Sequence, residues 1–230
     1  VVGGSPAWIE QFPSVVQVQS TSGNNIWFSY CGGSILNEIY VLSAAHCFEE
    51  LLDQGLRRIK AGTRDLHGGG VNSVINRVHM HPDYNPRLTG LDDDICLCRL
   101  TTPLVWSNSI RQIAIPPQGF IVPHNAQTTY AGWGLLWFQG PRPNVLHSVN
   151  VPKIDHAECQ RIFGQVIVSP RQLCAGSPGM SSCNGDSGGP LYYNNMVIGV
   201  VSWGFYCGEV NPAVNSKVSS YTNWILATAV

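Results

Sequence analysis

Ser181-Ser182-Cys183-Asn184-Gly185-Asp186-Ser187-Gly188-Gly189-Pro190 is the stretch of this chain that says most about its fold and chemistry. Glycines surround the serine at position 187, and glycine reaches backbone angles that other residues adopt only with strain. Such a loop can expose a serine hydroxyl and aim the backbone N–H groups of Gly185 and Ser187 at an oxygen that becomes negative during acyl transfer. Taken alone, the same run is also compatible with an ordinary turn, so its meaning depends on the rest of the chain.

The composition indicates a protein built mainly from strands and turns. Of the 230 residues, 44% are hydrophobic and only 12% are charged, and 24 glycines and 15 prolines are present. This combination favours many short strands over long helices. A formal net charge of −1 leaves no electrostatic footprint for nucleic acid or an anionic membrane. No apolar run approaches the ~20 residues that span a bilayer, so we expect neither kind of partner.

Short apolar stretches between turn signals predict the strands. They cover residues 15–19, 34–45, 95–100, 130–133, 149–154 and 196–203, with loops at 20–25, 67–72, 85–91 and 135–143. Pro116-Pro117-Gln118-Gly119, near the middle, is the best candidate for a linker, because proline cannot donate to a strand ladder. Only residues 219–229 show a helical period, with Tyr221, Trp224 and Ile225 on one face. The sequence therefore predicts two antiparallel β-barrels and a C-terminal helix.

Two further motifs carry residue types that complement Ser187. Ala44-Ala45-His46-Cys47 places a histidine after a predicted strand, and Asp92-Asp93-Asp94-Ile95 places aspartates before another. Each motif alone has an ordinary structural explanation, as a packed histidine or a solvated turn. Together they supply a base that can take a proton from the serine and a carboxylate that can orient the base.

With these motifs the chain resembles the trypsin family of chymotrypsin-fold serine proteases. The matching motifs, in order, are Val1-Val2-Gly3-Gly4, Cys31-Gly32-Gly33-Ser34, Ala44-Ala45-His46-Cys47, Asp94-Ile95, Gly132-Trp133-Gly134, Gly185-Asp186-Ser187-Gly188-Gly189-Pro190 and Ser202-Trp203-Gly204. They extend from the first residue almost to the last. The resemblance implies an all-β fold of two antiparallel six-stranded β-barrels with a C-terminal α-helix. Residues 1–112 and 113–230 would form the two halves of one peptidase domain.

The resemblance also implies a secreted serine endopeptidase and a role for each site residue. Ser187 would attack the scissile carbonyl, and His46 would take the proton of Ser187 and give it to the leaving amine. Asp94 would orient the imidazole. The N–H groups of Gly185 and Ser187 would form the oxyanion hole. Ser202 would support Asp94.

Activation by proteolysis is a further implication of the resemblance. The ammonium of Val1 would insert and pair with Asp186, so the chain is expected to be the processed form of an inactive precursor. A buried ion pair of this kind fixes a conformation more reliably than it adds stability.

The substrate pocket is expected to be neutral. Trypsin-like members have an aspartate where this chain has Ser181, and without it a buried Lys or Arg would lack a partner. Gly204 would leave the mouth open, while the methyl of Ala213 would shorten or narrow the back wall. We expect a preference for apolar residues before the scissile bond, with Leu, Met, Phe or Tyr ahead of Trp. One alternative is elastase-like cleavage after small residues. The other is that Ser181 and Ala213 are sequence variation with little effect on specificity. Asn184, Ser202 and Trp203 complete the expected substrate-binding residues.

Eight cysteines in a turn-rich chain indicate an oxidising compartment. The resemblance pairs Cys31 with Cys47, Cys159 with Cys174, and Cys183 with Cys207. Cys96 and Cys98 remain, at i and i+2 of a predicted strand and therefore on one face. We expect two buried free thiols; a strained disulfide is the alternative, and a metal site would lack a second pair of ligands. No metal or other cofactor is expected.

The expected partners are protein or peptide substrates and protein protease inhibitors, and the chain is expected to act extracellularly as a monomer. The alternative from another class is a non-catalytic homologue that only binds partners. The presence of His46, Asp94 and Ser187 together favours the enzyme. The residues do not distinguish a digestive enzyme from a regulatory one.

Overall fold

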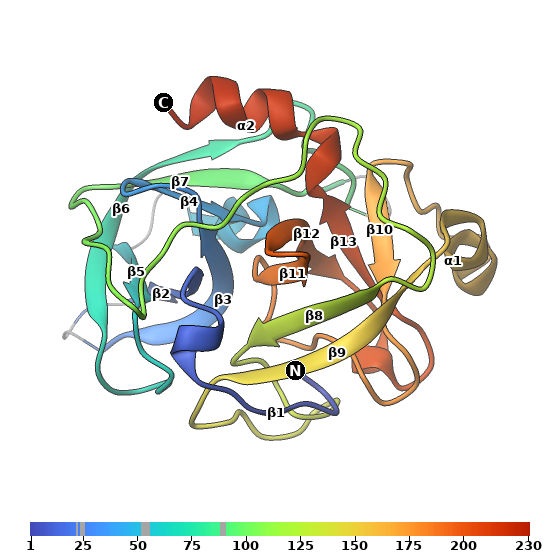
Figure 1. Ribbon diagram of the computed structural model, residues 1–230, viewed down its shortest axis with the longest axis horizontal. Helices are drawn as coiled ribbons and strands as arrows, with labels where there is room; N and C mark the ends of the chain where they lie inside the picture. Colours follow the sequence, from blue (N-terminus) through green and yellow to red (C-terminus); the bar gives the residue numbers. More distant parts are fainter. Residues whose placement is uncertain (22, 24–25, 52–55, 88–90) are drawn as a thin grey trace.

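The computed structural model describes residues 1–21, 23, 26–51, 56–87 and 91–230, and its strands form two barrels side by side (Figure 1). Parts of the expected loops at 20–25 and 85–91 lie outside the described residues. The strands are β1 (Ser5–Pro6), β2 (Val15–Ser20), β3 (Phe28–Ile35), β4 (Tyr40–Ser43), β5 (Arg57–Ala61), β6 (Val71–Met80), β7 (Cys96–Leu100), β8 (Gln127–Gly132), β9 (His147–Ile154), β10 (Gln172–Ala175), β11 (Pro190–Tyr193), β12 (Met196–Trp203) and β13 (Ala213–Lys217). The helices are α1 (His156–Phe163) and α2 (Thr222–Thr228), with short 3₁₀ turns η1 (Ile9–Gln11), η2 (Ala45–Leu51), η3 (Tyr206–Gly208) and η4 (Val218–Ser220).

The first barrel is closed in the order β2-β3-β4-β7-β6-β5, with antiparallel neighbours. Val16 and Val18 of β2 belong to its buried core. The opposite face of β2 is buried as well, since Gln17 and Gln19 are 0% and 3% exposed, so β2 is covered on both faces and is not a half-buried strand. The expected single stretch at 34–45 is wrong, because it contains a turn between β3 and β4. The side chain of Asn37 accepts from the backbone N–H groups of Ile39 and Tyr40 at 3.0 and 2.8 Å, which is how asparagine stabilises a turn.

The second barrel follows the order β9-β10-β13-β12-β11-β8, and the pairing of β8 with β9 closes it. The short N-terminal strand β1 adds to its outer edge, where Ser5 lies opposite Ser148 of β9. Val1 is fully buried in the core of this barrel. The first residues of the chain therefore complete the second barrel, although the first barrel follows them in sequence.

The predicted C-terminal helix is present as η4 and α2, and Ile225 of α2 packs into the core of the first barrel. The expectation of no other helix is wrong, since α1 lies between β9 and β10. The side chain of Asp155 caps its N-terminus by accepting from Ala157 at 2.9 Å. At eight residues α1 is too short to show a convincing period, and Cys159 and Phe163 are its only buried residues.

The segment between the barrels contains the predicted linker. The N–H of Gly119 donates to the Ser219 carbonyl at 2.8 Å, and the Thr222 hydroxyl donates to the Pro116 carbonyl at 2.8 Å. The linker is thus fixed against the C-terminal helical segment. In the described part of the chain, no helix is long and apolar enough to cross a membrane.

Candidate active site

Three polar residues from the two barrels meet at one cleft. His46 lies in η2 directly after β4, Asp94 lies just before β7, and Ser187 lies in the loop before β11. His46 and Ser187 line the same cleft. Nδ1 of His46 lies 2.7 Å from Oδ2 of Asp94, and the backbone N–H of His46 donates to Oδ1 of the same carboxylate at 2.9 Å. The histidine ring is therefore oriented at two points by one aspartate.

Asp94 is fully buried, and serines of the second barrel hold it. The Ser202 hydroxyl on β12 donates to Oδ2 of Asp94 at 2.5 Å. The Ser216 hydroxyl on β13 donates to the backbone carbonyl of Asp94 at 2.7 Å. Burying a carboxylate is costly unless donors such as these hydrogen-bond to it. The position of Asp94 thus depends on the docking of the two barrels.

The three consecutive aspartates have different partners. Arg171 bonds to Asp92 at 2.6 Å and to Asp93 at 2.9 Å. The Tyr221 hydroxyl donates to the other oxygen of Asp93 at 3.2 Å. Among the three, Asp94 is the one whose carboxylate reaches His46.

Two opposing effects set the protonation of His46. Burial lowers the pKa of His46, but the charge of Asp94 and its hydrogen bond raise this pKa by more, so the net pKa lies above the ordinary value. Because the carboxylate accepts from Nδ1–H, the neutral ring keeps Nε2 free as a proton acceptor. This is the tautomer that a general base needs.

The loop around Ser187 requires glycine at two positions with positive φ. Gly185 has φ +94° and Gly188 has φ +76°. A Cβ at Gly188 would also collide with the Ser43 hydroxyl. The Ser187 carbonyl accepts from Gly32 N–H at 2.7 Å, which anchors the loop to β3. Within the described residues, the N–H groups of Gly185 and Ser187 have no protein acceptor, so both remain available as donors.

A buried ion pair lies behind this loop. The Val1 ammonium is 2.7 Å from Oδ2 of Asp186, with both side chains at most 2% exposed. The ammonium also donates to the carbonyls of Gly134 and Leu135 at 3.1 and 3.0 Å. The Asp186 carboxylate accepts from the N–H groups of Gly134 and Cys183 at 2.8 and 3.0 Å. Both the ammonium and the carboxylate therefore make further hydrogen bonds to the backbone.

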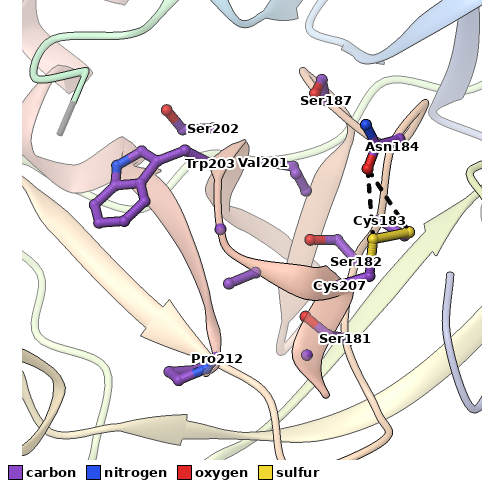
Figure 2. A pocket seen from close by; sticks show the side chains of 13 residues that line it. Ser181, Ser182, Cys183, Asn184, Ser187, Val201, Ser202, Trp203, Cys207 and Pro212 are labelled. Atoms are coloured by element: carbon purple, nitrogen blue, oxygen red, sulfur yellow. Dashed lines mark hydrogen bonds between the residues drawn. A yellow bond between two sulfur atoms is a disulfide. The ribbon is translucent and has the colours of Figure 1, made fainter. Parts of the chain in front are cut away.

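A neutral pocket of about 190 Å³ opens beside Ser187. Figure 2 shows Ser187 at one end of this pocket and Ser181 at the other. Ser181 is fully buried, and its hydroxyl has no hydrogen-bond partner in the described part of the chain. The residues that line the pocket, none of them charged, are Ser181, Ser182, Cys183, Asn184, Ser187, Val201, Ser202, Trp203, Gly204, Cys207, Gly208, Pro212 and Ala213. All six residues predicted to bind substrate are among them.

One disulfide and an apolar loop border the pocket. The three disulfides join Cys31 to Cys47, Cys159 to Cys174 and Cys183 to Cys207, and Cys96 and Cys98 are buried free cysteines. Leu135 and Phe138 pack on the Cys183–Cys207 disulfide, and Phe138 meets the Tyr206 ring at a centroid distance of 5.3 Å. The loop at 135–143 thus supports the outer wall of the pocket.

Sequence reasoning missed three residues of the site. Ser182 belongs to the decapeptide around Ser187 but was given no role, and Ser216 lies in no motif that would suggest one. Arg142 lies in the predicted loop at 135–143, and its Nη1 donates to the backbone carbonyl of Ser29. Its Nη2 occupies the space beside Gly185 that a Cβ there would need. Only the folded position of the loop brings this cation to the cleft.

Comparison with known proteins agrees with this geometry. The family model described as Trypsin matches residues 1–225. Alkaline trypsin A of Manduca sexta is 36% identical, over 98% of this chain and 89% of that protein. Trypsin-1 of Astacus astacus is 35% identical over the full length of both, and the vitellin-degrading protease of Bombyx mori is 32% identical over 98% of this chain and 84% of that protein. A match of this extent, on a chain that folds into two six-stranded barrels around a serine, a histidine and an aspartate, shows that the protein belongs to the trypsin family of serine endopeptidases.

Proposed function

We propose that Ser187, His46 and Asp94 are the nucleophile, the general base and the orienting carboxylate of this endopeptidase. The observation that carries the proposal is the short contact between His46 and the buried Asp94, in the cleft that His46 shares with Ser187. The Ser187 oxygen attacks the scissile carbonyl while its proton passes to Nε2 of His46. The imidazolium then gives the proton to the leaving amine, and water hydrolyses the acyl-enzyme by the same steps.

The N–H groups of Gly185 and Ser187 are proposed as the oxyanion hole. Both come from one rigid loop, and neither is used by another acceptor in the described structure. Donors fixed in advance stabilise the charge that develops on the carbonyl oxygen without reorganisation. Removal of one such donor from an acyl-transfer site typically costs about 10²–10³-fold in kcat.

Labelling with a sulfonyl fluoride tests the proposed roles. One equivalent should react, at Ser187, and the Ser187→Ala variant should not be labelled. Ser109→Ala is the matched control and should be labelled normally, because Ser109 lines neither the cleft nor the neutral pocket. Labelling at another residue, or none in the folded wild-type protein, would contradict the assignment.

We also propose that the enzyme cleaves after apolar residues. The pocket beside Ser187 carries no charged side chain, and Ser181 occupies its far end. A Lys or Arg side chain would lose its hydration there without gaining a counter-ion, which is costly. Ala213 lies next to Gly204, since a Cβ at Gly204 would be 3.8 Å from the Ala213 methyl, so this methyl limits the room for a large ring.

A panel of peptides that differ only in the residue before the scissile bond tests this specificity. We expect Leu, Met, Phe and Tyr to give the highest kcat/KM, with Trp lower and Lys and Arg lowest. Ala213→Gly should improve Trp relative to Leu, because one methyl group in a pocket is worth about 1–3 kcal/mol. A maximum at Lys or Arg would refute the proposal, while a maximum at Ala or Val would indicate elastase-like cleavage.

Proteolytic activation and secretion complete the proposal. A peptide bond to the Val1 nitrogen would remove the charge that pairs with Asp186, so an extended precursor would lack this ion pair. The three disulfides favour an extracellular location, where disulfides persist. A cleft that admits a peptide strand also admits the exposed loop of a protein inhibitor, so we expect such inhibitors to bind this monomeric enzyme.

A further inference from the structure

A groove with three cationic side chains continues the catalytic cleft on the side away from the neutral pocket. The neutral pocket and the cleft share Asn184 and Ser187, whereas the cleft and the groove share Arg142. We call this groove, of about 660 Å³ and containing Arg58, Lys60 and Arg142, the basic groove. Since the neutral pocket takes the residue before the scissile bond, the basic groove lies on the side of the leaving group.

Arg142 is held at the junction of the cleft and the basic groove. Its Nη1 donates to the Ser29 carbonyl of β3, and its Nη2 lies beside Gly185 of the loop that carries Ser187. The guanidinium remains cationic even when partly buried, and its planar fork of donors suits a carboxylate. A peptide that leaves the cleft beside Ser187 therefore passes this cation.

Arg58 and Lys60 form the farther part of the basic groove. Nε of Arg58 donates to the side chain of Gln19 at 2.8 Å, and its guanidinium lies 4.0 Å above the Trp27 ring. These contacts fix the arginine in place. Lys60 is only 6% exposed, and burial and the neighbouring Arg58 charge lower its pKa, partly offset by Asp65. The positive charges of Arg58 and Lys60 repel each other, so a substrate carboxylate bound between them would relieve the repulsion.

The charge of the basic groove is not a general property of the molecule. The whole chain has a formal net charge of −1, and no acidic residue is among the described residues that line this groove. Glu49 lines the cleft instead, where its charge acts on His46. An acidic residue directly after the scissile bond would meet Glu49, whereas farther along the described lining residues include Arg142, Arg58 and Lys60 and no acid.

We propose that the basic groove binds the substrate segment after the scissile bond and selects acidic side chains from its second residue onward. The proposal rests on the endopeptidase activity described above and adds a second determinant of specificity, separate from the neutral pocket. Charge complementarity between the groove and an acidic peptide supplies the selection.

Internally quenched peptides test the proposal. All carry the same residues up to and including the one directly after the bond, followed by either two Asp or two Lys residues. At low salt the Asp peptide should have a kcat/KM about tenfold above that of the Lys peptide, since each partly exposed ion pair contributes about a few-fold. The ratio should shrink at ~1 M salt, where screening acts within about 3 Å. Equal rates at low salt would overturn the proposal.

Variants locate the effect. Arg142→Gln and Arg58→Gln should each lower the Asp-to-Lys ratio about threefold, and Arg142→Lys should retain most of it. Arg161→Gln on α1, which removes a side chain that is 73% exposed, is the control and should leave the ratio unchanged. A ratio unaffected by Arg142→Gln and Arg58→Gln together would refute the assignment.

A small ester substrate separates this proposal from the catalytic one. Its leaving group does not enter the basic groove, so its hydrolysis reports only on the catalytic residues and the neutral pocket. It also shows that each variant is folded. Ester hydrolysis with equal rates on the two peptides would refute the basic groove alone, whereas loss of all hydrolysis by the wild-type protein would refute the proposed function.

Discussion

Asp186→Asn should inactivate the enzyme by breaking the buried pair with the Val1 ammonium. One carboxylate oxygen, Oδ2, faces both this ammonium and the Cys183 N–H, and the other accepts from the Gly134 N–H. If the asparagine NH₂ took the place of Oδ2, it would face two donors, the Val1 ammonium and the Cys183 N–H. If the amide were flipped, its NH₂ would face the Gly134 N–H, and the ammonium would be left with a neutral oxygen.

The magnitude follows from the burial of the pair. Val1 and Asp186 are 0% and 2% exposed, and removing one partner of a buried pair costs about 3–5 kcal/mol because the other charge is left uncompensated. At ~1.4 kcal/mol per tenfold, the equilibrium constant for ordering the loop that carries Gly185 and Ser187 should fall by at least about a hundredfold. We expect kcat/KM to fall by a factor that approaches this one, as the disordered loop becomes populated.

Ester hydrolysis, together with titration of the active serine, measures this loss. Acetylation of the Val1 nitrogen should have a similar effect, and acetylation of the Asp186→Asn protein should add little, as expected for two partners of one interaction. Glu158→Gln, which breaks an exposed pair with Arg161 on α1, is the control and should leave activity unchanged. Activity of Asp186→Asn within about threefold of wild type would refute the reasoning, since a buried pair predicts a far larger loss.

Three further predictions concern His46, Ser202 and the two free cysteines. Because the pKa of His46 is raised and catalysis needs the neutral ring, kcat/KM should rise with pH through a midpoint above about 6.5. Asp94→Asn should move that midpoint downward, and an unchanged midpoint in the pH profile would contradict this. Ser202→Ala removes a donor from a fully buried carboxylate and should lower kcat about tenfold, from the ~1–3 kcal/mol of an unsatisfied group; an unchanged kcat would show that Ser202 does not support Asp94. Thiol titration in denaturant should find two groups, from Cys96 and Cys98, and finding none would mean that they form a disulfide.

Much of the fold could be predicted because its information is local. The short apolar stretches at 15–19 and 196–203 correspond to β2 and β12. The turn at Asn37 was missed because it is embedded in apolar residues, and only its side-chain hydrogen bonds identify it. Helix α1 was missed because its buried face consists of only Cys159 and Phe163.

Some residues of the candidate site could be predicted from the sequence, and others could not. His46, Asp94 and Ser187 each lie in a motif that their sequence neighbours make distinctive. Arg142 has no such motif, and its place beside Gly185 follows from the path of a whole loop across to β3. Interactions between residues distant in sequence determine such positions, and a single sequence does not reveal them.

The pairing of β1 with β9 and the burial of Val1 in the second core have a consequence for the order of folding. We expect the loop that presents Ser187 to reach its final form only when Val1 meets Asp186, which lies 185 positions later in the sequence. Contacts of such long sequence separation form late, because closing a long loop is entropically unfavourable. We therefore expect the barrels to assemble before the catalytic loop does, so that activity appears as the last event of maturation.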